Sequence, residues 1–209
     1  MECAEAALHR LCDPAAEVSA HYVVGGRGEL WQLVPEEARA WHAGTGAWGA
    51  VHDVNSRSIG IELVNPGPLD GLPPYPEPQM VALERLLDDI MARWNIPPAR
   101  VIGHSDMAPG RKADPGPKFD WSRLARGGRA IFVGERGLGP ATADWEVFAR
   151  ACGVMGYHAA DVGGWPVVLG AFRLRFRPWA SGPLSATDVA LALEIARRHP
   201  CVDAPALPT

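Results

Sequence analysis

The stretch RVIGHSDMAPGRKADPG, residues 100–116, joins a short apolar run to a loop rich in polar and turn-forming residues. The run RVIGH predicts a buried strand that places His104 at its carboxyl end, where α/β sheets usually bind their ligands. Asp114 follows ten residues later, with Lys112 two positions before it. Ten residues match neither a helical nor a strand repeat, so only a folded loop can bring His104 and Asp114 together.

The residue types of this loop suit a hydrolytic zinc site, which needs about three protein ligands and an open position for water. Histidine and aspartate are zinc ligands, and a cation such as Lys112 can stabilise the oxyanion of a tetrahedral intermediate. The residues alone leave another interpretation open, because a lone histidine and aspartate in a loop are more often structural. Lys112 would then be a surface lysine that pairs with Asp106 or Asp114.

A second polar position lies on the strand predicted at residues 56–65, SRSIGIELVN. Side chains alternate between the two faces of a strand, so one face carries Ile59, Ile61 and Leu63 and the other carries Ser58, Gly60 and Glu62. Gly60 leaves room for another group to approach beside Glu62. Glu62 is therefore a candidate general base, and a solvated strand glutamate is the alternative.

Other patterns define the fold class around these segments. The first residues predict a helix that ends at Asp13-Pro14, and residues 19–34 predict a β-hairpin around a Gly-Gly-Arg-Gly turn. Another helix is predicted to end before Pro97-Pro98, because apolar residues recur on one of its faces: Met80, Leu83, Leu86, Leu87, Ile90, Met91 and Trp94. Strand, helix and strand in this order predict an α/β fold with a mixed β-sheet covered by helices.

The composition changes after Trp121. Residues 126–140 are rich in glycine and arginine and show no long periodic pattern, so we expect a linker there. It would join a domain at residues 1–125 to a small all-α domain at residues 141–209. Within the second domain helices are expected at about 141–155, 165–177 and 185–199, the last with Ser185 as its N-cap.

Length and charge narrow the class of protein. A chain of 209 residues is long enough for one domain or for one domain and a smaller second one. Its 20 Lys and Arg residues against 24 Asp and Glu residues give no electrostatic reason to expect nucleic acid or an anionic membrane as partner. No stretch approaches the roughly 20 apolar residues of a membrane span, and the first residues lack the pattern of a signal peptide. Widely spaced cysteines without a CxxC pair predict free thiols, at Cys3, Cys12, Cys152 and Cys201.

Several segments together resemble a known family. SAHYVV, AWHAG, NSRSIGIELVNPG and GHSDMAPGRKADPG, with FDW just after, resemble the zinc-dependent N-acetylmuramoyl-L-alanine amidases of the AmpD and AmiD type, whose fold is shared with peptidoglycan recognition proteins. The resemblance runs from about residue 3 to residue 124. The tail, with MGY, VVLGAFRLRFRP and SATDVALAL, resembles the helical peptidoglycan-binding domain that some of these enzymes carry.

The resemblance implies a reaction and a site. It makes His104 and Asp114 ligands of Zn²⁺, Glu62 the catalytic acid/base and Lys112 the stabiliser of the tetrahedral intermediate. The reaction would be hydrolysis of the amide between N-acetylmuramic acid and L-alanine in peptidoglycan or muropeptides, without an organic cofactor. Two further residues match family positions near the substrate groove and are substrate-binding candidates, His42 and Asn65. We expect a monomer without a nucleic-acid partner.

One feature of the family has no match. Its first zinc ligand is a histidine on a strand that precedes the opening helix, whereas His9, His21 and His42 do not match ligand positions and His52 is the remaining substitute. We expect a truncated start, and the alternatives are a catalytically inactive peptidoglycan-binding protein on the same fold or an unrelated α/β interaction domain. The compartment stays open: cytoplasmic for the chain as given, periplasmic or outer-membrane-anchored if a signal has been lost.

Aromatic and basic side chains add weaker expectations. Four tryptophans are candidates to line a groove for sugar and peptide, with core packing as the alternative: Trp31, Trp41, Trp48 and Trp121. Phenylalanines interleaved with arginines predict one helix with a mixed solvent and core face, and contact with anionic peptidoglycan or nucleic acid is the alternative for Arg173, Arg175 and Arg177.

Overall fold

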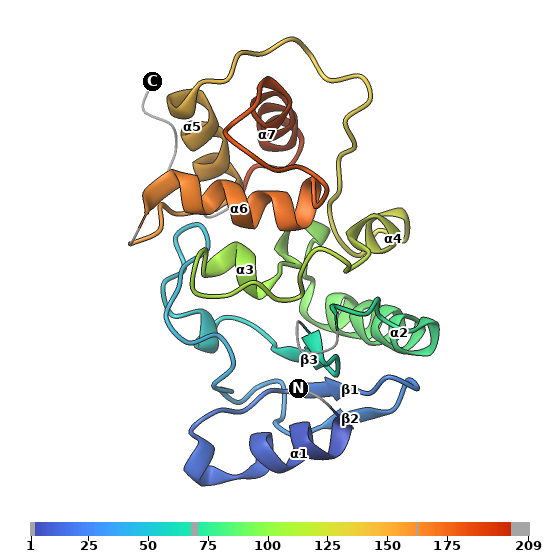
Figure 1. Cartoon of the computed structure of the whole chain (residues 1–209). Helices are drawn as coiled ribbons and strands as arrows, with labels where there is room; N and C mark the ends of the chain where they lie inside the picture. The colour runs from blue at the N-terminus through green and yellow to red at the C-terminus, as the bar shows by residue number, and fades with distance from the viewer. Residues whose placement is uncertain (1–2, 68–70, 162, 202–209) are drawn as a thin grey trace. The chain divides into compact units, whose positions relative to one another are not determined.

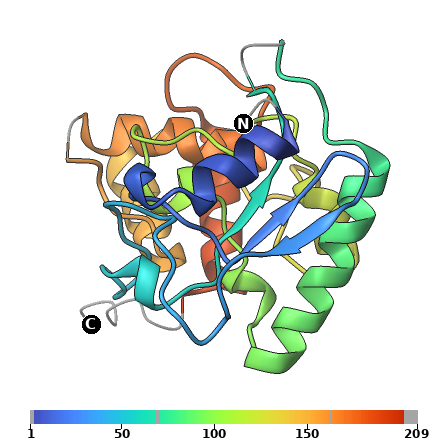
Figure 2. The same ribbon diagram turned by 90° about the horizontal axis from the view of Figure 1, so that it is seen from below.

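The computed structural model of this chain describes residues 3–67, 71–161 and 163–201. The chain forms two compact units. The first unit comprises Met1–Thr45 and Asp53–Ile96, and the second comprises Gly46–His52 and Pro97–Thr209. Figures 1 and 2 show the helices and strands of both units.

The first unit is built on a three-stranded mixed sheet in the order β2-β1-β3. The central strand β1 (Tyr22–Val24) pairs antiparallel with β2 (Leu30–Gln32) and parallel with β3 (Ile61–Leu63). The predicted hairpin and mixed sheet are therefore confirmed. The strands are short, with three residues each. Strand β3 therefore covers only three of the ten residues that alternate in the sequence.

Helices cover the sheet with the apolar faces that the sequence predicts. Helix α1 (Ala4–Cys12) buries Ala7 and Leu11 in one cluster with Ala20 and Val23. Helix α2 (Glu77–Trp94) buries Leu86 and Ile90 in a second cluster with Tyr22 and Val24, against which Ile59, Ile61 and Leu63 pack. Successive side chains of β1 thus enter different clusters, as strand alternation requires.

The ends of both helices follow local chemistry. Asp13 ends α1, and its carboxylate accepts a hydrogen bond from the backbone N–H of Ala15 (2.9 Å) at the start of a short 3₁₀ turn, Pro14–Ala16. Helix α2 ends before the predicted Pro97-Pro98, because Asn95 adopts the left-handed conformation at φ 51° and returns its N–H to Met91. A second 3₁₀ turn, Val54–Ser56, precedes β3.

The carboxylate of Glu36 ties the segment after β2 to the end of α2. It accepts hydrogen bonds from Nε of Arg93 (2.7 Å) and the hydroxyl of Tyr22 (2.6 Å), and its side chain is 5% exposed. The hydrogen bond from Arg93 outweighs partial burial and lowers the pKa of Glu36 to about 2. Burial, followed by the hydrogen bond and charge of the same carboxylate, raises the pKa of Tyr22 to about 12.

Replacing Glu36 with glutamine should lower the free energy of unfolding at pH 7 by about 2 kcal/mol, after allowance for solvent screening. Because the pKa of Glu36 falls from its ordinary value of 4.5 on folding, its stabilisation is present above that pH and is lost as the pH falls towards 2. Urea unfolding should show the gap between wild type and variant shrinking to less than half from pH 7 to about pH 2.5.

The matched control is Glu29→Gln, because Glu29 pairs with Arg27 in the same unit but the Arg27 side chain is 91% exposed. This variant should unfold at the urea concentration of the wild type. A Glu36→Gln chain as stable as wild type at pH 7 would contradict the prediction.

The segment of the second unit that starts at Pro97 differs from the sequence-based prediction. After a 3₁₀ turn at Pro98–Arg100, residues 101–103 form no strand, and helix α3 (His104–Met107) begins directly at His104. The predicted strand RVIGH is therefore wrong. Side chains hold the backbone groups that strand pairing would use: Arg175 donates to the carbonyl of Val101 (3.1 Å), and Gly103 N–H donates to the carboxylate of Asp106 (2.8 Å).

Four more helices follow α3 in the part of the second unit that the structure describes, and three of them confirm the pattern of the tail: α5 (Trp145–Met155), α6 (Gly164–Phe176) and α7 (Ala186–Arg198). Their shared core includes Phe148, Phe172, Phe176, Leu191 and Ile195. Ser185 caps α7 as predicted, in a capping box with Asp188. The fourth helix is α4 (Trp121–Arg126).

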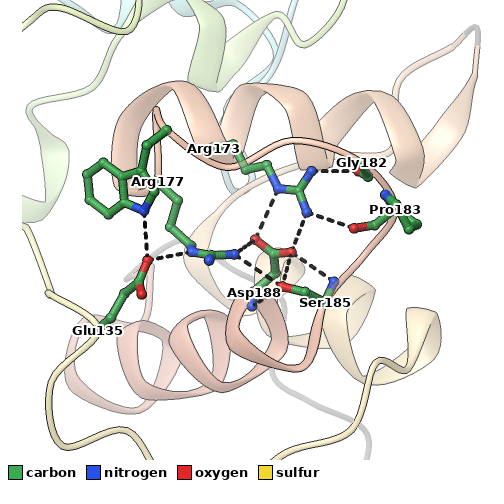
Figure 3. A network of polar contacts seen from close by, with 8 residues as sticks. Glu135, Arg173, Arg177, Gly182, Pro183, Ser185 and Asp188 are labelled. Carbon is green, nitrogen blue, oxygen red and sulfur yellow. Dashed lines mark hydrogen bonds and ion pairs between the residues drawn. The ribbon is translucent and has the colours of Figure 1, made fainter.

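The arginines in and just after α6 do not form the solvent part of the expected mixed solvent and core face. Arg173 and Arg175 are buried, and Arg177 is 12% exposed at its side chain. Arg173 and Arg177 both pair with the buried carboxylate of Asp188, as Figure 3 shows. Contact of these buried guanidiniums with peptidoglycan or nucleic acid, the other alternative, does not fit this arrangement.

The segment expected to be a linker is partly buried in the second unit. Arg126 still belongs to α4, and residues 127–144 carry neither helix nor strand, yet Ala130, Ile131 and Val133 have little exposure. The domain limits at 125 and 141 stay a prediction. All four cysteines are free thiols, and burial raises the pKa of Cys152.

None of the helices in the described ranges is long and apolar enough to cross a membrane.

Candidate functional site

The loop from Gly103 to Asp114 folds back on itself in the second unit. Ser105 N–H donates to the carbonyl of Asp114 (2.9 Å), and Lys112 N–H donates to the carbonyl of Ala108 (3.0 Å). The packing needs glycine at position 103, because a Cβ atom there would lie 2.8 Å from Cδ of Pro115. The backbone thus joins the two ends of the sequence motif directly.

This closure brings His104 and Asp114 together, which at their spacing only a folded loop can do. Nδ1 of His104 lies 3.0 Å from Oδ2 of Asp114, and the side chains are 15% and 60% exposed. Two ligand atoms of a tetrahedral zinc ion lie about 3.3 Å apart, because each bond is roughly 2.0–2.2 Å long. The pair therefore has the chemistry and nearly the spacing of two ligands of one ion.

Cations surround this pair. Partial removal from water acts to raise the pKa of Asp114, but the hydrogen bond and charge of His104, with a further contribution from Lys112, lower it below its ordinary value. A carboxylate that stays ionised is the form that binds a metal. Arg111 also approaches, with Nη2 3.5 Å from Nε2 of His104. Sequence reasoning passed over Arg111, although its place beside Lys112 in GRKAD was a signal.

Glu62 lies in β3 of the first unit, opposite Val23 of β1, and is partly buried. The space beside it at Gly60 is already filled. A Cβ atom at position 60 would lie 2.3 Å from Cγ of His42, so the glycine admits the His42 ring. The group predicted to approach Gly60 is therefore the imidazole of a substrate-binding candidate.

The rings of His42 and His21 are neighbours, with centroids 5.6 Å apart. His21 Nδ1 accepts a hydrogen bond from Gly60 N–H (2.9 Å), so its proton is on Nε2, which donates to the carbonyl of Ala38 (3.0 Å). Both ring nitrogens of His21 are thus engaged, which agrees with its exclusion as a metal ligand. The backbone at His42 is fixed by Asn55, whose Oδ1 accepts from His42 N–H (3.0 Å).

Asn65 closes the loop after β3. Its Nδ2 donates to the carbonyl of Pro73 (3.1 Å), and its Oδ1 accepts from Gly67 N–H (2.8 Å). In this structure the Asn65 amide therefore organises its own loop, and its part in substrate binding stays a prediction.

The tryptophans divide between surface and core. Trp41 is 56% exposed, with the Arg39 guanidinium 4.3 Å from its ring centroid, and it lines a surface pocket with the end of α1. Trp31 packs partly buried beside the α1 cluster. Trp48 and Trp121 are buried, so core packing holds for them and the groove interpretation is wrong.

The resemblance implies a third metal ligand beside His104 and Asp114. Within residues 3–67, 71–161 and 163–201, no group of three or more His, Cys, Asp or Glu side chains is placed to hold a metal ion. The proposed substitute, His52, packs its ring against His158 at a centroid distance of 5.5 Å. Two ligands of the implied set thus converge, and the described residues do not complete it.

The N-acetylmuramoyl-L-alanine amidase family model matches residues 1–117, which is more than half of the chain. The chain therefore belongs to this amidase family. It is 44% identical over 124 residues to the amidase AmiD of Escherichia coli, covering 54% of this chain and 45% of AmiD. It is 40% identical over 107 residues to the 1,6-anhydro-N-acetylmuramyl-L-alanine amidase AmpD of Enterobacter cloacae, covering 51% of this chain and 55% of AmpD.

Solved structures extend the likeness beyond the matched segment. The E. coli AmiD structure, a complex with anhydro-N-acetylmuramic acid-L-Ala-D-γ-Glu-L-Lys, aligns with a TM-score of 0.82 at 34% identity over 93% of this chain and 84% of AmiD. AmpDh3 of Pseudomonas aeruginosa aligns with a TM-score of 0.83 at 29% identity, over 95% and 89% of the two chains. The fold class is confirmed. The chain spans about half the length of the curated relatives it matches.

Proposed function

We propose that this protein hydrolyses the amide between N-acetylmuramic acid and L-alanine in muropeptides or peptidoglycan, with zinc held by His104 and Asp114. The carrying observation is the 3.0 Å approach of these two side chains inside the segment that the amidase family model matches. The substrate class follows from the AmiD complex, whose ligand contains the same amide.

The chain's own residues supply the proton transfers and the charge stabilisation. When bound, zinc supplies Lewis-acid polarisation of the scissile carbonyl and lowers the pKa of water. Glu62 accepts a proton from the attacking water and returns it to the L-alanine nitrogen as the C–N bond breaks. The Lys112 ammonium stabilises the negative oxygen of the tetrahedral intermediate.

The decisive experiment incubates the purified chain with zinc and anhydro-N-acetylmuramyl tripeptide. Mass spectrometry should detect the free tripeptide and the sugar acid, and release should stop when a chelator removes the metal. Metal analysis after dialysis should find about one zinc per chain.

A second candidate is a peptidoglycan-binding protein without activity. It is favoured by the observation that the described ranges place no three ligand side chains together. It predicts a zinc-free chain that sediments with cell-wall sacculi and releases no peptide. That result would overturn the proposed hydrolysis.

Replacing Lys112 with alanine should lower kcat by about 10²–10³-fold and change KM less, because the lysine acts on charge that develops in the transition state. The matched control is Lys118→Ala, since Lys118 is the chain's other lysine and is also exposed. Steady-state release of tripeptide measures both. Equal losses in the two variants would show that net charge, and not the position of Lys112, governs the rate.

A further inference from the structure

The fourth residue of GHSD, Asp106, has no exposed surface. Its carboxylate accepts hydrogen bonds from Gly103 N–H (2.8 Å), from the Tyr157 hydroxyl and from Nη1 of Arg175 (2.7 Å). The first of these bonds fixes the residue immediately before His104. The other two come from the tail of the chain, outside residues 1–117 that the family model matches.

Arg175 holds more than Asp106. Its guanidinium, with the side chain 2% exposed, also donates to the carbonyls of Val101 (3.1 Å) and Ile131 (3.4 Å) and lies 4.1 Å from the ring centroid of Trp121. One arginine of α6 therefore contacts the backbone before His104, the carboxylate after it and the ring of α4. Figure 1 shows α6 beside α3 within this unit.

Tyr157 holds Asp106 from another side. Burial, followed by the charge of Asp106, raises the pKa of Tyr157 well above its ordinary value, so the hydroxyl stays protonated and can donate. The ring packs edge-on against Trp48 at a centroid distance of 4.9 Å. The donor therefore has a fixed position.

A buried ion pair is a poor source of net stability, because desolvation of both charges offsets most of their attraction. What such a pair supplies is a fixed geometry, since any displacement leaves a charge unpaired in the interior. The Asp106 carboxylate holds the N–H of Gly103, the residue before His104. The geometry that it fixes is therefore that of the backbone from which the His104 side chain projects.

We propose that Arg175 and Tyr157 are positioning residues of the His104 site, acting through Asp106. Its consequence for catalysis rests on the proposed function. The helical tail would then be part of the structure that supports the metal ligands, in addition to any role in holding glycan.

The comparison variant lies on the same helix. Arg173 is buried and pairs with Asp188 at 2.6 Å, but its other hydrogen bonds go to the carbonyls of Gly182 and Pro183. Arg173→Lys therefore disturbs a buried ion pair of similar kind that does not reach the loop at 103–116. Arg175→Lys and Tyr157→Phe disturb the one that does.

Hydrogen–deuterium exchange by mass spectrometry tests the positioning without any metal. Peptides covering residues 103–114 should exchange about ten times faster or more in Arg175→Lys and Tyr157→Phe than in wild type, as local openings of this loop become easier. Arg173→Lys should leave these peptides unchanged. Titration with Co²⁺, followed by its visible absorption, should show affinity about 10–100 times weaker in Arg175→Lys and unchanged in Arg173→Lys.

The outcomes separate the two proposals. Unchanged loop exchange in both Arg175→Lys and Tyr157→Phe overturns the positioning role, as does equal acceleration in Arg173→Lys. If Arg175→Lys does not fold, Tyr157→Phe decides, because it removes one hydroxyl and leaves the ion pair. If loop exchange responds as expected but wild type binds no Co²⁺, the positioning role stands and the proposed metal chemistry fails.

Discussion

Replacing Glu62 with glutamine is expected to lower kcat for tripeptide release by about 10²–10⁴-fold while KM changes by a few fold at most. An amide of the same size cannot accept the proton of the attacking water. The backbone of β3 should not change, because Glu62 lies on the face opposite Ile61 and Leu63, which pack against the cluster beneath α2.

Three measurements make this prediction specific. Steady-state release gives kcat and KM, urea unfolding checks the fold, and zinc analysis checks that metal remains bound. Glu37→Gln serves as control, because Glu37 is an exposed glutamate of the same unit and the charge change is identical. A Glu62→Gln chain with normal zinc content and wild-type kcat would remove Glu62 from the proposed mechanism.

Local patterns explain why most helices and the hairpin could be predicted from the sequence. The apolar face of α2, the stop at Asp13 and the Ser185 cap depend on residues within a few positions of each other. Interactions of this range are fully contained in a short window of sequence. The same holds for the closure that joins His104 to Asp114, because glycine and proline mark the turns between them.

The failures depend on residues far apart in the chain. The run at Val101 has the composition of a strand, but its carbonyl is held by Arg175, 74 residues later. The sequence pattern around Arg173 fits a helix with a solvent face, but Nε and Nη2 of Arg173 donate to the carboxylate of Asp188, 15 residues later. The sequence pattern at Gly60 likewise did not show that the ring of His42 fills the space beside it. No periodicity shows such pairings.

The candidate site shows the same division. His104, Lys112 and Asp114 belong to one loop, and their residue types suit metal chemistry, which the resemblance to the amidases then implies. Asp106 lies in the same motif, yet its three hydrogen-bond donors could not be named from sequence, because two of them come from positions 157 and 175. A motif thus reveals its exposed chemistry more readily than the buried contacts that support it.

Replacing Asp188 with asparagine is expected to destabilise the second unit by about 3–5 kcal/mol, because it breaks a buried network of opposite charges. Figure 3 shows how the carboxylate is shared. Oδ1 accepts from Nε of Arg173 (3.1 Å) and Nη1 of Arg177 (2.6 Å), while Oδ2 accepts from Nη2 of Arg173 (2.6 Å) and Ser185 N–H (2.9 Å). Asparagine would leave Arg173 without a counter-charge and would leave Arg177 with only that of Glu135.

The pH dependence gives a second signature of the same network. Burial acts to raise the pKa of Asp188, but the hydrogen bonds from Arg173, Ser185 and Arg177 outweigh it and hold the pKa well below its ordinary value of 3.8. A depressed folded-state pKa stabilises the protein above that ordinary value, and the stabilisation is lost as the pH falls below it. Asp188→Asn should therefore lose less stability than wild type on acidification from pH 5.

Urea unfolding followed by tryptophan fluorescence should detect the loss as a lower midpoint for Asp188→Asn at pH 7. Asp161→Asn is the matched control, because Asp161 is an exposed aspartate of the same unit, and its midpoint should stay at the wild-type value. If Asp188→Asn cost less than about 1 kcal/mol, the value of an exposed pair, the two arginines would have to find other partners. That result would mean that the Asp188 charge is not needed for stability. The burial of Arg173 and Arg177 would then be explained by apolar packing of their aliphatic stems.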